Sequence, residues 1–170
     1  MTLLEQLKDL LKISRQKKRN EFNRVLSVGE YLSDRFEKAA YLGFGEGSSI
    51  YDSALVFGDV RVGKNCWIGP FTILDGSGGP LIIGDGCNIS AGVQIYTHDT
   101  VDKVNGGGER AVGPVTVGRN CYIGPQSVVS YGVEVGEYSV IGALSLVNRS
   151  IPPGARVYGT PARSSQERLD

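Results

Sequence analysis

The one histidine of this 170-residue chain, His98, is the side chain best able to move a proton at neutral pH. Its neutral imidazole could take a proton from a hydroxyl group as that group attacks an electrophile, and such a general base contributes about 10²–10⁴-fold in rate. The base also needs a partner on its other ring nitrogen. Asp99 is adjacent, but neighbouring side chains of an extended chain point to opposite sides. A backbone carbonyl or another acid, such as Glu109, is an equally good candidate.

The three cysteines, Cys66, Cys87 and Cys121, could supply nucleophiles, metal ligands or a disulfide. Their number is odd, and none are spaced as in a CxxC motif. All three occupy the fifth position of a six-residue repeat, where other units hold small or β-branched residues such as Val93 and Ser127. The shared position predicts free thiols that fill a core, so we expect no thiol nucleophile and no metal site.

The repeat is marked by an aliphatic residue at every sixth position, followed at seven places by glycine. The fourteen units begin at Ile50, Val56, Val62, Ile68, Leu74, Ile83, Ile89, Ile95, Val117, Ile123, Val129, Val135, Ile141 and Val147. Insertions at 76–80 and 100–115 divide the units into three blocks. His98 stands just before the longer insertion.

A period of six fits neither an α-helix nor an alternating strand. It fits a short strand followed by a corner, with three such units closing a triangular coil of about 18 residues. Stacked coils form a parallel β-helix whose aliphatic side chains point inward, and glycine permits the tight backbone at each corner. The sequence therefore predicts an all-β domain over 43–163, with 100–115 as an extended loop and 164–170 as a tail.

Residues 1–42 are predicted to form an N-terminal helical segment. The leucines at 3, 4, 7, 10 and 11 form one stripe of a helix over 2–26, and Thr2 with Glu5 can form a capping box. A second helix is expected over 30–40. The basic cluster 15–19 is typical of a solvated helix face, and a weak association with a membrane surface or a partner stays open.

Composition excludes several classes of protein. Lys and Arg together number 18, as do Asp and Glu, so no overall field attracts nucleic acid. No apolar run reaches the roughly 18 residues of a membrane span. The N-terminus does not read as a signal peptide, because Glu5, Lys8 and Asp9 interrupt its apolar stretch. A cytoplasmic protein is expected.

From about Ile50 to Arg163 the chain resembles the hexapeptide-repeat acyltransferases, which include maltose and galactoside acetyltransferases and O-acetyltransferases of bacterial surface polysaccharides. The resemblance is densest at 117–125 and 135–143, and the ending 151–163 is similar to the closing segment of the family. It implies a left-handed parallel β-helix and a homotrimer with active sites between adjacent subunits. The loop 100–115 would help to enclose the site.

The resemblance also implies roles for particular residues. His98 matches the catalytic base of the family. Arg149 and Arg163 match basic positions that meet the phosphates of coenzyme A, and Gly142 and Ala143 match a stretch whose main chain binds the cofactor. Gly124 occupies the equivalent place one coil earlier. The residue after it, Pro125, has no N–H to donate, so the oxyanion donor is not identified.

The acceptor site departs from the sugar-specific relatives. Ser90 stands where the galactoside and maltose enzymes have a sugar-binding asparagine, which argues against those substrates. Tyr96, Asp99, Asn105 and Arg110 are the other candidates to contact an acceptor.

The expected activity is transfer of an acetyl group from acetyl-CoA directly to a sugar hydroxyl, in the synthesis of a surface polysaccharide such as O-antigen or capsule. N-acetylation of an amino sugar or nucleotide-linked amino sugar is the nearest alternative, and a non-catalytic β-helix scaffold is another. A γ-type carbonic anhydrase is excluded, because it needs three zinc-bound histidines.

Overall fold

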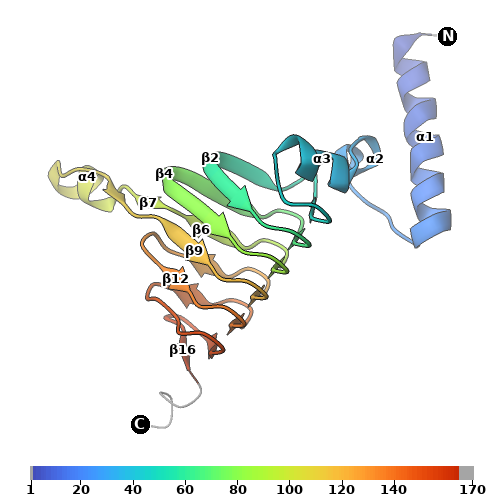
Figure 1. The fold of residues 1–170 in the computed structure, drawn as a ribbon. Helices are drawn as coiled ribbons and strands as arrows, with labels where there is room; N and C mark the ends of the chain where they lie inside the picture. The colour runs from blue at the N-terminus through green and yellow to red at the C-terminus, as the bar shows by residue number, and fades with distance from the viewer. Residues whose placement is uncertain (1, 165–170) are drawn as a thin grey trace.

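The computed structural model describes residues 2–164, so the predicted tail at 164–170 lies outside the described residues except for Ser164. Three helices precede a triangular prism of stacked coils (Figure 1). They are α1 (Leu3–Phe22), α2 (Val28–Leu32) and α3 (Arg35–Tyr41). The prism is a parallel β-helix of hexapeptide repeats, as predicted.

The prism has three faces of parallel strands, which we call A, B and C. Face A contains β1 (Ser49–Ile50), β3 (Trp67–Ile68), β5 (Asn88–Ile89), β10 (Tyr122–Ile123), β13 (Val140–Ile141) and β15 (Arg156–Tyr158). Face B contains the first halves of β2 (Leu55–Val62) and β4 (Ile73–Ile83), with β6 (Gln94–Tyr96), β11 (Val128–Val129) and β14 (Leu146–Val147). Face C contains the second halves of β2 and β4, with β9 (Val115–Val117) and β12 (Glu134–Val135).

The repeating aliphatic residues form inward ladders, one for each face. On face A the ladder is fully buried from Ile50 to Ile141 and ends at Val157. A regular coil consists of three repeat units, because Ile50 pairs with Ile68. The burial of these side chains is the main stabilising contribution, at about 25 cal/mol for each Å² of apolar surface removed from water.

Two edges of the prism matter for the site. The AB edge, between faces A and B, consists of residues 69–71, 90–92, 124–126 and 142–144. The BC edge, between faces B and C, consists of residues 75–80, 96–98, 130–132 and 148–150. The long loop leaves the prism at the BC edge.

The two insertions differ in structure. The first, 76–80, does not interrupt the strand: β4 continues through it, with a register shift against β2 between Gly58 and Val60. In the second, β7 (His98–Asp99) pairs antiparallel with β8 (Ala111–Val112), and the short helix α4 (Val101–Gly106) lies between them. Helix α4 has no buried residue and projects from the prism (Figure 1).

The cysteines are buried and free, as their position in the repeat predicts. Each thiol donates to a carbonyl of the next coil: Cys66 to Gly84 at 3.1 Å, Cys87 to Gly118 at 3.0 Å and Cys121 to Gly136 at 3.1 Å. The hydroxyls of Ser48 and Ser139 do the same at the two ends of this column. Hydrogen bonding with the other two thiols, together with burial, raises the pKa of Cys87, so it remains a thiol.

The N-terminal helices differ in detail from the prediction. The Thr2–Glu5 capping box forms, but α1 ends at Phe22 rather than 26, because Asn23 adopts a left-handed conformation as its C-cap. The helix expected over 30–40 is divided into α2 and α3. Asp34 caps α3 by accepting the N–H groups of Phe36 and Glu37, which ends the preceding helix.

Helix α3 is fixed to the first coil by Lys38, whose Nζ donates to three backbone carbonyls, those of Tyr51, Asp52 and Ala54. Within residues 2–164, no helix is both long enough and apolar enough to cross a membrane.

Replacing Gly118 with alanine should destabilise the protein, because the added Cβ would lie 2.5 Å from the backbone nitrogen of Glu137. We expect the free energy of unfolding to fall by about 1–3 kcal/mol, the usual cost of overpacking. Urea unfolding followed by circular dichroism measures the change. Gly106→Ala is the control, since no atom lies within 4 Å of its added Cβ. Equal destabilisation by the two variants would contradict the tight coil stacking.

Candidate active site

His98 lies on the BC edge where the long loop begins, and its ring meets the first insertion. The imidazole Nδ1 is 3.3 Å from the hydroxyl oxygen of Ser77, which belongs to the insertion 76–80. It is also 3.8 Å from Oδ2 of Asp75. The His98 side chain is partly exposed, whereas Asp75 is buried. The histidine is thus held on one side and open on the other.

The hydrogen bonds around Ser77 determine which ring nitrogen carries the proton. The carboxylate Oδ1 of Asp75 accepts the Ser77 hydroxyl at 2.6 Å and the Ser77 backbone N–H at 2.9 Å. Because the hydroxyl hydrogen is used by Asp75, the Ser77 oxygen is left to accept from Nδ1–H of His98. This arrangement favours the neutral tautomer whose free lone pair is on Nε2.

Thr97 and Gly78 connect to this cluster through hydrogen bonds. Thr97 is fully buried; its hydroxyl donates to the Asp75 carbonyl at 2.8 Å and accepts the Gly78 N–H at 2.9 Å. A side chain at Gly78 would collide with the Thr97 carbonyl and with Cβ of His98. The glycine therefore lets the insertion pass close to the histidine.

Asp99, one of the candidates to orient His98, directs its carboxylate to the backbone of Val101 instead. Its Oδ1 accepts the Val101 N–H at 2.7 Å and so caps the start of α4. The other predicted acid, Glu109, is exposed in the loop. The acid beside the imidazole is Asp75, which sequence reasoning misses.

The candidate acceptor residues lie in three places. Tyr96 is next to the cluster, with its hydroxyl donating to Gln94 at 2.8 Å; burial, and then the charge of Asp75, raise its pKa. Arg110 reaches back from the loop to donate to the Ser77 carbonyl at 3.0 Å. Asn105 is exposed on α4. Ser90 is buried on the AB edge, away from the BC edge that carries His98.

Gly124, Gly142 and Ala143, whose main chain is expected to bind the cofactor, are also on the AB edge. The N–H groups of Gly124 and Gly142 are already used in coil stacking, donating to Ile141 and Val157 at 2.8 Å each. Ala143 is exposed, and no acceptor in the described part of the chain takes its N–H. Of this predicted set, Ala143 is the residue with a backbone donor left for a ligand.

The two predicted arginines line a cavity of about 480 Å³ at the C-terminal end of the prism. Arg149, Arg156 and Arg163 surround it, and Val147, Ile151 and Val157 contribute its apolar wall. Arg149 follows β14, which is two strands along face B from β6 and hence about 10 Å from the His98 coil. Arg163 donates to the Ala162 carbonyl at 2.7 Å.

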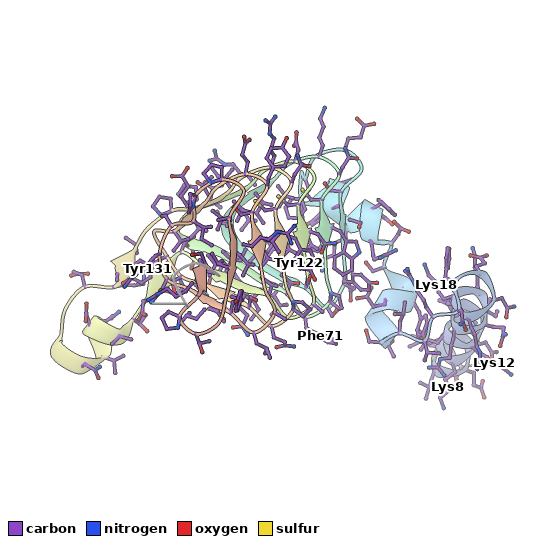
Figure 2. All side chains as sticks on the ribbon, turned by 90° about the horizontal axis from the view of Figure 1, so that it is seen from below. Lys8, Lys12, Lys18, Phe71, Tyr122 and Tyr131 are labelled. Carbon is purple, nitrogen blue, oxygen red and sulfur yellow. The ribbon has the colours of Figure 1, made fainter. Side chains whose placement is uncertain are left out.

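One chain therefore divides the predicted residues between two edges. His98, Tyr96 and Arg149 belong to the BC edge, and Ser90 and Ala143 belong to the AB edge. Figure 2 shows the separation: Tyr131 of the BC edge lies on the side that carries α4, and Phe71 of the AB edge lies on the side toward the N-terminal helices. Among residues 2–164, no three His, Cys, Asp or Glu side chains are grouped to hold a metal ion.

The pairing register of the coils is the feature from which Asp75 and Ser77 could have been identified. Ile50 pairs with Ile68 in a regular coil, whereas Leu74 pairs with Ile95, because the first insertion lengthens this coil. The same longer step along the chain leads from Ser77 to His98, so the insertion places Ser77 against the ring. Asp75 follows as the acid two positions before it.

The geometry predicts the behaviour of the His98 ring in NMR spectra. Because the chain has one histidine, tag-free protein gives one set of imidazole signals. Ser77→Ala and Asp75→Asn should each shift the ring ¹⁵N resonances, since each removes or weakens the hydrogen bond that fixes the tautomer. Asp99→Asn is the control and should leave them unchanged. A shift with Asp99→Asn alone would show that the ring partner is misassigned.

Comparison with known proteins agrees with the repeat and the fold. Residues 114–149 match the bacterial transferase hexapeptide of six repeats, and residues 59–97 match the hexapeptide repeat of succinyl-transferase. The carnitine operon protein CaiE of Escherichia coli is 34% identical over 122 residues, which are 68% of this chain and 62% of that protein. Galactoside O-acetyltransferase of Escherichia coli is 33% identical over 112 residues, 64% of this chain and 54% of that enzyme. The matched part of the chain thus spans less than two thirds of these relatives.

A solved hexapeptide-repeat containing acetyltransferase from Vibrio cholerae has a TM-score of 0.60 at 26% identity, covering 94% of this chain and 90% of that one. A further structure of that acetyltransferase, complexed with acetyl coenzyme A, has a TM-score of 0.55 at 25% identity, covering 93% of this chain and 86% of that one. By its repeats, its relatives and its fold, the chain belongs to the hexapeptide-repeat transferase family.

Proposed function

We propose that the protein is an acetyl-CoA-dependent O-acetyltransferase that acts on a sugar hydroxyl, with His98 as general base. The observation that carries this proposal is the Asp75–Ser77–His98 arrangement, in which Nδ1 is occupied and Nε2 is free. The similar proteins support the proposal, because galactoside O-acetyltransferase and the Vibrio protein are both named as acetyltransferases. The prism would coil in the left-handed sense, as in the hexapeptide-repeat acyltransferases that the sequence resembles.

In the proposed reaction, Nε2 of His98 accepts the proton of the sugar hydroxyl as its oxygen attacks the thioester carbonyl. The new carbon–oxygen bond forms and the carbon–sulfur bond breaks. His98 then gives the proton to the departing coenzyme A sulfur, which returns the ring to its neutral form. Ser77 and Asp75 hold the ring in place during these steps. Transfer is direct in this proposal, and no acyl-cysteine forms, since all three cysteines are buried.

We further propose that the working site lies between two copies of the chain in a homotrimer. A single chain places His98 and Arg149 on one edge and Ser90 and Ala143 on another, so these residues can converge only if the BC edge of one copy meets the AB edge of the next. Arg149 and Arg163 would then meet the phosphates of coenzyme A, and the exposed Ala143 N–H would meet its pantetheine arm.

The acceptor is proposed to be a sugar of a surface polysaccharide or its precursor. Ser90 replaces the asparagine of the galactoside enzymes, so free galactosides are poor candidates. Tyr96, Asn105 and Arg110 would contact the acceptor from the loop side. A panel of hydroxyl and amino acceptors, read by mass shift, separates this activity from N-acetylation.

Removing the base should abolish transfer. We expect His98→Ala to lower kcat at least about 10²-fold, within the usual range for general-base catalysis. Ser77→Ala and Asp75→Asn should lower kcat about 10-fold with little change in KM, because they act on the base and not on substrate binding. Thiol release from acetyl-CoA measures the rate, and Asp102→Asn, at an exposed acid of α4, serves as control. Unchanged turnover with His98→Ala would show that His98 is not the general base.

Mixing two inactive variants should restore activity if the site is shared between copies. His98→Ala removes the base on the BC edge, and Ala143→Trp obstructs the exposed AB edge without entering the core. Co-expressed trimers would contain some interfaces that combine an intact His98 with an intact Ala143. We expect a measurable fraction of wild-type activity from the mixture and none from either variant alone. No recovery in mixed trimers would place the site within one chain.

A further inference from the structure

The N-terminal helix α1 presents an apolar stripe that the rest of the chain does not cover. None of its residues is buried, and Leu3, Leu4, Leu7 and Leu10 are 82%, 60%, 44% and 50% exposed. Figure 1 shows α1 beside the prism, with α2 and α3 between them. A continuous exposed stripe of leucines is costly in water, so a surface that removes it from water is expected.

Contacts hold α1 through its second half. The guanidinium of Arg15 lies 5.7 Å from the ring centre of Tyr31 in α2, and the Tyr31 hydroxyl accepts the Leu26 N–H at 2.6 Å. Leu3, Leu4 and Leu7 precede this contact by two turns or more. The apolar end of the helix therefore extends free of the prism.

Basic residues run along one flank of the stripe. Lys8, Lys12, Arg15 and Arg19 are spaced by four, three and four residues, which places them on one side of the helix. Helix α1 contains six basic and three acidic residues. Figure 2 shows Lys8, Lys12 and Lys18 on the helical segment away from the prism. An apolar stripe bordered by lysine and arginine complements a surface that is apolar inside and anionic outside.

A second copy of the helix fits this pattern less well. A coiled-coil seam through Leu4, Leu7 and Leu11 would continue through Ser14 and Lys18, which would bring a charge into the centre of the bundle. The positions that flank this seam, occupied by residues 3, 8, 10, 15, 17 and 22, hold basic or apolar side chains and no acid. They offer no opposite-charge pair between helices.

We propose that α1 lies in the surface of an anionic lipid bilayer, with its leucine stripe among the acyl chains and its basic flank at the headgroups. The leucines supply burial and the basic residues supply attraction to negative lipid. This inference rests on the proposed acetyl transfer. If α1 holds the prism at the membrane, a lipid-linked sugar, which is presented there, is the acceptor that the protein would meet.

Flotation with vesicles tests the binding. Full-length protein should float with vesicles of phosphatidylcholine and phosphatidylglycerol, and should do so far less with phosphatidylcholine alone or at high salt. Leu7→Glu should abolish flotation, and the pair Lys8→Glu with Lys12→Glu should weaken it at least about tenfold. Ile13→Glu is the matched control, because Ile13 is also exposed on the same helix but lies off the stripe.

Two results would overturn the proposal. One is equal, weak flotation with both kinds of vesicle. The other is a change in the lipid-free oligomeric state with Leu7→Glu, measured by analytical ultracentrifugation, which would assign the stripe to a second copy. Acetylation of a water-soluble acceptor should be unchanged by Leu7→Glu. Loss of vesicle binding with retained acetylation therefore separates the role of the helix from the proposed activity.

Discussion

The prism, and with it the candidate site, depends on the hydrogen bond that joins each corner glycine to the next coil. The Gly118 N–H donates to the Val135 carbonyl at 2.7 Å, and other glycines of the repeat do the same one coil apart. A carbonyl accepts this bond only if the following coil has the matching register. The inward aliphatic ladders then remove their side chains from water, and the register of one coil determines that of the next. The prism is stable because these two effects require the same spacing.

The site forms where that spacing is broken. The first insertion lengthens one coil, and the excess is absorbed on the BC edge without ending β4. Ser77 then stacks on His98, and Asp75 lies buried behind it. The insertion thus performs two tasks: it carries Ser77, and its Gly78 lets the chain pass close to the ring.

The sequence predicts those parts that the repeat controls. The β-helix, the buried cysteines and the position of His98 beside the loop all follow from counting by six. The partner of His98 does not follow from this counting. In the repeat, the first insertion shows only as a phase shift, so nothing in the sequence points to Asp75, and Asp99 is nearer to His98 along the chain. Asp99 instead caps α4, a helix that no periodicity indicates. The break at Asp34 escapes prediction for the same reason, since a local cap prevails over an apolar pattern.

For the proposed activity, acceptor specificity would lie in the segments that the repeat does not constrain. The loop is attached to the prism by the β7–β8 pairing, by backbone hydrogen bonds of Gly113 with Thr97 and Gly132, and by the bond from Arg110 to the Ser77 carbonyl. Its helix α4 exposes Val101 and Val104 rather than packing them. Because these side chains contribute little to stability, they can vary without cost to the fold, whereas Asp75 and Ser77 are tied to the register of the coils. The proposed general base and its support are therefore a property of the prism, and the choice of acceptor, on the same proposal, would be a property of the loop and of the surface that holds the protein near its substrate.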